Sequence, residues 1–420
     1  MMKVLKTLIA AAFAATMFSG CTKVTKLELY YYKQENQQGL KNIIKAYMKE
    51  NPNVVITPFI IPNDADATMS ARAAQNKLPE IMQIQSYGRV REYAEKGFLA
   101  DLSETEALSK CVPSALPAVT WNDKQYAVPM DFAGIGIIYN KDIFAKYNLK
   151  APETYHDLQE VCAVLEENDI VPFSALLKEN WSAGHFITMI HTALLAEQGI
   201  TPDEFIASMN DGNGSYGDVD TDKLFSILRE YRQYMNSNAE EMGGGEQQQS
   251  FANGESAMMV QGLWAFVDAL KLNPDLNAGF IPFPVYDDPL MNKLYADVDS
   301  TFAVSSQSTP EKQAEAIKFL NWLSSEEGQA LWVSEYKLTN SFVGCDFSSL
   351  GVPFDELMKS VAAKGSYPWA FSQYPSQVFE SACKNGAQQF MMGAKSAEAV
   401  IADIDAEWAA AHREKSSAGS

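Results

Sequence analysis

Carboxylates that stand next to one another are the first residues in this chain that could do catalytic chemistry. Three such pairs are Glu166–Glu167, Glu240–Glu241 and Asp287–Asp288. A glycoside hydrolase needs two carboxyl groups that oppose each other across the scissile bond, whereas adjacent residues on helices or loops suit solvation better. The sequence also contains no GxSxG, HExxH or P-loop motif, and no dinucleotide-binding glycine motif that follows a strand. These patterns argue against an enzyme, and a glycoside hydrolase stays open as an alternative.

Aromatic residues flanked by polar ones are a stronger indication. Sugars present apolar C–H faces that stack on aromatic rings, and hydroxyl groups that bond carboxylates and amides. Trp181 follows Glu179 and Asn180, and Phe132 follows Asp131. Such neighbours are typical of a carbohydrate-binding site. The competing interpretation is that the tryptophans belong to the core, because Trp is highly buried on average.

Residues that could hold a metal ion lack the required spacing. The segment 211–222 superficially resembles a calcium loop, but Tyr216 replaces the glycine of its sharp turn and Asp222 replaces the bidentate Glu. His185 and His191 fall on a predicted helix, and no CxxC pair occurs. We expect neither a metal nor a cofactor, and an ion at 211–222 stays open. The disulfide state also stays open for Cys111, Cys162, Cys345 and Cys383.

The start of the predicted fold is a β-α-β unit. Residues 26–32 and 54–61 have the composition of strands, and residues 40–48 between them have the apolar spacing of an amphipathic helix. This order implies a parallel sheet with helices on its faces. Ligands bind beyond the carboxyl ends of such strands, so the loop 33–38 is a candidate site. The next strand, ending at Ile84, leads into Gln85–Arg89 in the same way.

The segment 126–147, YAVPMDFAGIGIIYNKDIFAKY, contains an apolar run that is bounded by Gly134 and by Asn140 to Asp142. Its middle, Ile135–Tyr139, reads as a strand buried on both faces, followed by a short helix. Pro129 and Gly134 bracket an irregular approach that carries one carboxylate, Asp131, and one aromatic ring, Phe132. A length of 420 residues favours two domains.

This segment resembles the family 1 extracellular solute-binding proteins of ABC importers, which pass between lobes through Y-x-x-P and I-Y-N-K-D-x-F. The resemblance implies that the approach with Asp131 and Phe132 is a hinge between two lobes. Further stretches fit the same family in the same order along the chain. They are LPEIMQIQ (78–85) with YAEKGFLADL (93–102), WNDKQYAVP (121–129), FANGESAMMVQGLW (251–264) and AIKFLNWLSSEEGQ (316–329). The resemblance spans nearly the whole chain after its first segment, and its motifs are strong in combination.

The resemblance implies a set of ligand-binding positions. Trp181 and Trp264 match positions of sugar-stacking rings, and Trp369 is a third candidate platform. Polar candidates lie in the loop after the first strand, after the third strand, at the hinge and before a returning strand; with Phe132 they are Gln34, Glu35, Asn36, Gln85, Arg89, Asp131 and Asp299. Gln85 departs from the aromatic residue of maltodextrin-binding relatives. Glu35 has a competing role at a helix N-terminus.

The implied fold is α/β, of the two-lobed periplasmic binding protein type II class, with mixed or parallel sheets, flanking helices and three crossings. We place the first lobe at 27–130 and 289–333, and the second at 131–288 and 334–412. Crossings are expected near 130, within 278–288 and near 334–340. Residues 413–420 are expected to be a flexible tail.

The first residues resemble an export signal. A basic start at 1–6, an apolar run at 7–17 and the site FSGC at 18–21 predict a signal peptide over 1–20. Cys21 stands where the bacterial lipobox is lipidated, and 21–26 would link the lipid to the fold. An ordinary cleaved signal is the alternative.

A formal net charge of −20 argues against nucleic acid as a partner. The resemblance implies a monomer, lipid-anchored outside the cytoplasm, that binds a carbohydrate, an oligosaccharide or glycoside, and delivers it to the membrane subunits of an ABC permease. The alternatives are a non-sugar solute, with Lys33, Arg89 and Arg91 as anion contacts, or a lipid-anchored glycoside hydrolase.

Overall fold

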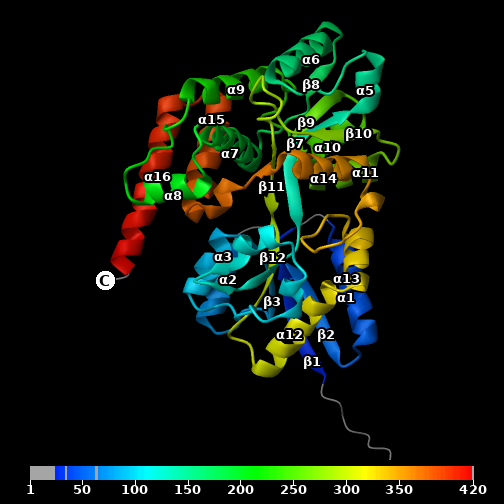
Figure 1. Ribbon diagram of the computed structural model, residues 1–420, viewed down its shortest axis with the longest axis vertical. Coiled ribbons are helices and arrows are strands. Elements are labelled where there is room, and N and C mark those ends of the chain that lie inside the picture. The colour runs from blue at the N-terminus through cyan, green and yellow to red at the C-terminus, as the bar shows by residue number, and fades with distance from the viewer. Residues whose placement is uncertain (1–23, 34–35, 62–64, 419–420) are drawn as a thin grey trace, which may run out of the picture.

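The chain folds into two lobes, each built on one β-sheet, as the prediction of a two-lobed α/β fold required (Figure 1). The computed structural model describes residues 24–33, 36–61 and 65–418. The predicted signal peptide, the lipidation candidate Cys21 and the ligand candidates Gln34 and Glu35 lie outside the described residues.

A five-stranded sheet forms the centre of the first lobe. Its strands, in spatial order, are β2 (Val54–Ile60), β1 (Thr25–Tyr31), β3 (Ile81–Gln85), β12 (Ser300–Val304) and β6 (Ala127–Pro129). β1 pairs with β2 and β3 in parallel, and β12 runs antiparallel to β3 and β6. The predicted β-α-β start is confirmed. Beside this sheet lies the hairpin of β4 (Thr120–Trp121) and β5 (Lys124–Gln125).

Helices cover this sheet because each has one apolar face. In α1 (Gln37–Glu50) the residues Leu40, Ile43, Ile44 and Tyr47 are buried, at the 3.6-residue spacing of one helix face. The other helical segments of the lobe are α2 (Ala65–Ala74), α3 (Gly88–Glu95), α4 (Glu106–Ser109), η1 (Pro113–Val119), α12 (Pro310–Leu323), α13 (Glu326–Leu331) and the π-helical turn η2 (Trp332–Tyr336).

A six-stranded sheet forms the second lobe. Its order is β13 (Ser366–Tyr367), β11 (Leu294–Val298), β7 (Phe132–Asn140), β9 (Ser256–Gly262) and β8 (Val171–Phe173), with β10 (Ala278–Ile281) paired to β7. In β7, Ile137 and Ile138 are fully buried on opposite faces, because successive side chains of a strand alternate. The prediction of a strand buried on both faces is confirmed.

Several helices of the second lobe begin at side-chain caps. Asn140 caps α5 (Lys141–Lys146), Thr154 forms a capping box with Asp157 on α6 (Tyr155–Glu167), and Asp220 caps α9 (Thr221–Gln233). The remaining segments are α7 (Asn180–Glu197), α8 (Pro202–Asn210), α10 (Gly244–Ala252), α11 (Leu263–Leu272), η3 (Ser348–Leu350), α14 (Val352–Lys364), η4 (Ala370–Gln373), η5 (Val378–Cys383), α15 (Lys384–Met391) and α16 (Ala397–Ala418).

Crossings between the lobes are hydrogen-bonded to one another. Asp131 joins β6 to β7, and Asp299 joins β11 to β12; the Asp299 amide donates to the Asp131 carbonyl at 2.9 Å. The Ser341 amide donates to the Met130 carbonyl at 2.9 Å, which lays the third connection against the first. The expected hinge at Asp131 therefore coincides with a change of sheet.

Two of the expected crossings are misplaced. Residues 289–298 were assigned to the first lobe, but β11 pairs with β7 in the six-stranded sheet, so that crossing lies at Asp299. Residues 334–340 were expected to lead into the second lobe, yet Phe342 still pairs with Cys111 of the first lobe. Short apolar segments fit either sheet, and pairing partners decided between them.

One local expectation also needs correction. The expected tail from 413 is instead helical through Ala418, consistent with the good helix formers Ala, Arg, Glu and Lys in that segment.

Candidate functional site

Polar groups gather at one edge of the first-lobe sheet. β1, β3 and β6 end at this edge, and the antiparallel β12 begins there. Lys33 follows β1, Asp131 follows β6, and Asp299 and Ser300 stand at the start of β12. Carboxyl ends of parallel strands are where open α/β sheets bind ligands. The edge thus coincides with the crossings.

Lys33 joins the carboxylates of two crossings. Its Nζ donates to Oδ2 of Asp131 and to Oδ2 of Asp299, and Ser300 Oγ donates to Asp131 Oδ2 at 2.6 Å. Lys33 is 5% exposed and Asp131 0% exposed. In this conformation Asp131 therefore holds the hinge and offers no surface to a solute. We call Lys33, Asp131 and Asp299 the hinge triad.

The two signs of charge keep the hinge triad together. Burial lowers the pKa of Lys33, but the nearby Asp131 and Asp299 carboxylates outweigh burial and hold that pKa well above its ordinary value. Burial raises the pKa of Asp131 more than the Lys33 ammonium lowers it. Lys33 is thus charged at neutral pH, and its charge is internally compensated.

The other polar candidates differ in what they can offer. Gln85 is the last residue of β3 and is exposed. Arg89 pairs with Glu92 at 2.7 Å, and its guanidinium lies 5.7 Å from the Tyr93 ring centroid. Asn36 is nearly buried, and its Oδ1 accepts from Lys271 Nζ of α11 at 3.2 Å. Asn36 therefore contacts the opposite lobe.

Rings of the second lobe form a continuous series, which we call the aromatic wall: Trp264, Trp369, Phe371, His185 and Trp181. Ring centroids lie 6.3 Å apart for Trp264 and Trp369, 5.4 Å for Trp369 and Phe371, and 4.9 Å for Phe371 and His185. Trp181 meets His185 edge-on at 5.8 Å. The three predicted tryptophans, far apart in sequence, are thus brought together.

The members of the aromatic wall differ in exposure. Trp264, Trp181 and His185 are half-buried, whereas Trp369 is 2% exposed and its Nε1 donates to the Tyr295 carbonyl at 2.9 Å. Trp369 consequently packs edge-to-face against Trp264 and has no free face in this conformation. Trp181 Nε1 donates to Glu179 Oε2 at 2.5 Å, which fixes its ring beside a carboxylate. Phe132 is half-buried at the start of β7.

A tyrosine that we did not predict joins the two lobes. The hydroxyl of Tyr87, between β3 and α3, donates to both carboxylate oxygens of Asp297 in β11, each at 3.1 Å. Asp297 Oδ2 also accepts from the Trp369 amide at 3.1 Å. Burial and the Asp297 carboxylate raise the pKa of Tyr87 far above its ordinary value, so the hydroxyl stays a donor. The signal in the sequence was an aromatic residue in the loop after a parallel strand.

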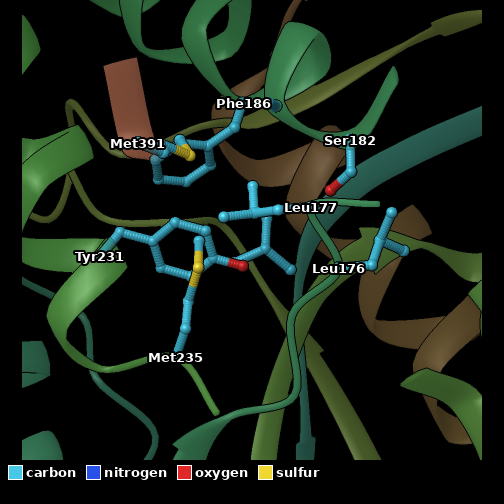
Figure 2. A pocket seen from close by; sticks show the side chains of 9 residues that line it. Leu176, Leu177, Ser182, Phe186, Tyr231, Met235 and Met391 are labelled. Atoms are coloured by element: carbon cyan, nitrogen blue, oxygen red, sulfur yellow. The ribbon is translucent and has the colours of Figure 1, made fainter. Parts of the chain in front are cut away.

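A cavity inside the second lobe does not fit a sugar. Figure 2 shows it between Phe186, Tyr231, Met235 and Met391, with Leu176, Leu177 and Ser182 on its other side. Its volume is about 220 Å³, including space open to solvent. Most of the side chains that line it are apolar, whereas a small-molecule site also needs several convergent polar groups. This cavity is a packing gap among core side chains.

Within residues 24–33, 36–61 and 65–418, no cluster of His, Cys, Asp and Glu has the arrangement of a metal site. His191 is buried, and its Nε2 lies 3.0 Å from the Tyr216 carbonyl. Cys111, Cys162, Cys345 and Cys383 are free thiols. No helix of the described segments is long and apolar enough to cross a membrane.

The chain is similar to proteins that bind sugars. It is 25% identical over 258 residues to the melibiose/raffinose/stachyose-binding protein MelE of Bacillus subtilis, covering 60% of this chain and 59% of MelE. It thus spans about three fifths of that relative. Among solved structures, RafE in complex with raffinose and a chitin oligosaccharide binding protein each superpose with a TM-score of 0.79, at 20% and 19% identity. Each match covers 93% of this chain and 100% of the other.

The family model of the bacterial extracellular solute-binding proteins matches residues 32–330, well over half of the chain. The match contains the hinge at Asp131, Tyr87, Trp181 and Trp264. This match confirms the prediction of a binding protein rather than an enzyme, and it replaces the alternative of a glycoside hydrolase. The chain belongs to the bacterial extracellular solute-binding protein family.

Proposed function

We propose that this protein captures a carbohydrate, an oligosaccharide or glycoside, between its two lobes and delivers it to an ABC permease. The observation that carries the proposal is the aromatic wall, whose two half-exposed tryptophans, Trp264 and Trp181, stand at opposite ends. Separated stacking rings suit a ligand with several sugar units better than a single small solute. The printed ligands of MelE, RafE and the chitin oligosaccharide binding protein support the same class.

Binding would require the lobes to close around the hinge at Asp131 and Asp299. Trp264 and Trp181 would stack on the ligand from the second lobe, while Gln85, Arg89 and the loop 34–36 would bond its hydroxyls from the first. A hydrogen bond to a charged group contributes roughly 1.5–3 kcal/mol. A few such bonds and two stacked rings reach the approximately 8 kcal/mol of a micromolar site.

An anionic solute has less support from the geometry. Lys33 is engaged by two carboxylates, Arg89 by Glu92, and the Arg91 guanidinium lies 5.1 Å from the Trp121 ring centroid. Each cation proposed for an anion already has a partner, so a neutral ligand is favoured.

The test is a thermal-shift screen of the mature protein against mono- and oligosaccharides. A ligand that binds only the folded state raises Tm according to its affinity. We expect a shift with one class of oligosaccharide and no consumption of it. An unchanged Tm with every sugar tested would overturn the carbohydrate assignment.

Lipid anchoring through Cys21 is part of the proposal and has its own test. In a bacterial host, the full chain should fractionate with membranes, and Cys21→Ser should release it or leave it unprocessed. Equal processing together with equal membrane association of both chains would remove the anchor from the proposal.

A further inference from the structure

The Ser86–Tyr87–Gly88 turn of the first lobe presses against the second lobe where the aromatic wall begins. We propose that Tyr87 is a positioning residue for this wall: its hydroxyl fixes the Asp297 carboxylate, Asp297 fixes the backbone of Trp369, and Trp369 supports Trp264. This inference rests on the proposed function for its ligand, and it adds a residue that would act on Trp264 through Asp297 and Trp369.

The backbone of Tyr87 is held in an unusual conformation. Its φ of 52° and ψ of −99° lie outside the regions that non-glycine residues populate. The turn is fixed on both sides: the Tyr87 amide donates to the Ala118 carbonyl at 2.7 Å, and Ser86 Oγ donates to the Val298 carbonyl at 2.7 Å. Such conformations persist only when their surroundings enforce them, and they cluster at functional sites. The strained turn aims the side chain at Asp297.

Asp297 links Tyr87 to Trp369, whose ring packs against Trp264. One carboxylate oxygen accepts from the Trp369 amide at 3.1 Å and the other from the Val298 amide at 2.7 Å, while Tyr87 donates to both. The Trp369 indole then donates to the Tyr295 carbonyl and meets Trp264 edge-on, at an interplanar angle of 87°. The chain of contacts thus leads from the first lobe to the half-exposed face of Trp264.

Gly88 shows how closely the two lobes meet at this turn. A Cβ added at Gly88 would lie 2.7 Å from the backbone carbonyl oxygen of Ser372, in η4 of the second lobe. That contact is closer than real Cβ atoms show, so any side chain there must push the turn away from η4. Gly88→Ala therefore acts as a wedge that leaves the Tyr87 hydroxyl chemically intact.

The first readout needs no sugar. In Tyr87→Phe, Asp297 loses one donor, and the Trp369 amide should exchange with solvent about tenfold faster, as measured by NMR on 15N-tryptophan-labelled protein. Gly88→Ala should do the same. The matched controls are Tyr126→Phe, a half-buried tyrosine of the first-lobe core, and Gly245→Ala, where a Cβ meets nothing within 4 Å. Both controls should exchange like the wild type.

The second readout is affinity for the sugar found in the screen. Tyr87→Phe should weaken binding about tenfold, and the same substitution in a Trp264→Ala background should add little, because its effect passes through Trp264. Asp297→Asn, which keeps an acceptor, should bind better than Asp297→Leu. Unchanged exchange and affinity in Tyr87→Phe would overturn the inference; a wild type that binds no sugar would overturn only the proposed function, since the exchange readout stands alone.

Discussion

At the scale of single residues, the hinge triad places charged groups where water has little access, which is costly for each ion on its own. Lys33 and Asp131 are almost fully withdrawn from water, and burial of ions is tolerated only when they are paired. The triad holds two carboxylates against one ammonium, and the Ser300 hydroxyl adds a neutral donor. Its placement at two crossings makes it part of the hinge, with consequences for stability.

Replacement of Lys33 by Met should destabilise the protein by about 3–5 kcal/mol, because two carboxylates lose the cation that they share in a buried place. Urea denaturation of the two chains measures this difference. Lys359→Met is the matched control, since Lys359 is 75% exposed beside Asp355, and its midpoint should equal that of the wild type. A loss in Lys33→Met no larger than in the control would contradict the buried ion pair.

Replacement of Trp264 by Ala should weaken sugar binding at least about tenfold without unfolding the protein. The ring is only half-buried, so its loss removes a stacking surface and not a fully buried core side chain. Titration calorimetry with the sugar from the screen measures the effect, and circular dichroism checks the fold. Trp121→Ala, also half-buried but in the β4–β5 hairpin, is the control and should bind normally. Equal affinity in Trp264→Ala would remove the ring from the site.

The pH dependence of stability should carry a contribution from Asp297. Burial raises its pKa more than its hydrogen bonds from Val298, Trp369 and Tyr87 lower it. A raised pKa in the folded state means that the contribution is complete below the unfolded pKa of about 3.9 and is lost as pH rises through the folded pKa. Asp297→Asn does not titrate, so it should gain stability relative to wild type between pH 4 and pH 7. A stability difference that is equal at both values in denaturation experiments would refute this.

At the scale of elements, close packing depends on glycines where backbones meet. A Cβ at Gly39 in α1 would lie 2.2 Å from the carbonyl oxygen of Glu335 in η2, and one at Gly134 in β7 would lie 2.6 Å from Leu357 of α14. The first neighbour is backbone and cannot rotate away, whereas the second is the end of a flexible side chain. The α1–η2 contact is therefore the less forgiving of the two.

Gly39→Ala should destabilise the first lobe by about 1–3 kcal/mol, the usual cost of overpacking. Thermal unfolding measures it. Gly245→Ala, in α10 with open space around the added methyl, should be neutral or stabilising because Ala favours helices over Gly. Similar melting temperatures for the two variants would show that α1 and η2 can separate without cost.

At the scale of the whole molecule, the described conformation already has contacts between the lobes. Lys271 of α11 donates to Asn36, Tyr87 donates to Asp297, and Gly88 approaches Ser372. Tyr87–Asp297 lies close to the crossing at Asp299, whereas Asn36 belongs to the loop that leads into α1. A hinge motion would separate residues in proportion to their distance from the crossings, so the contacts should differ in how readily they open.

Saturating sugar should reduce the radius of gyration in small-angle X-ray scattering, because lobes that close by hinge motion become more compact. Trp264→Ala at the same sugar concentration should keep the ligand-free value. A radius that does not change while calorimetry reports binding would show that capture needs no closure.

The sequence by itself determined the elements whose patterns are long or capped. The β-α-β start, the apolar face of α1, the buried strand β7 and the caps of α5, α6 and α9 follow from periodicity and from side chains that bond nearby backbone. The two-lobed fold and the family of solute-binding proteins followed from ordered motifs. Local chemistry is sufficient for the strands, helices and caps, because the interactions that form them span only a few residues.

Only the tertiary structure decided what depends on partners distant in the chain. β11 joined the six-stranded sheet through pairing with β7, Asp131 found Lys33 98 residues away, and Trp369 was buried behind Trp264. The role of Tyr87 could not be predicted, because it depends on a hydrogen bond to Asp297, which lies 210 residues further along the chain. The sequence shows the same residue type whether a carboxylate or an aromatic ring faces a solute or a neighbouring side chain. Only the packing of the sheets and lobes decides between these two environments.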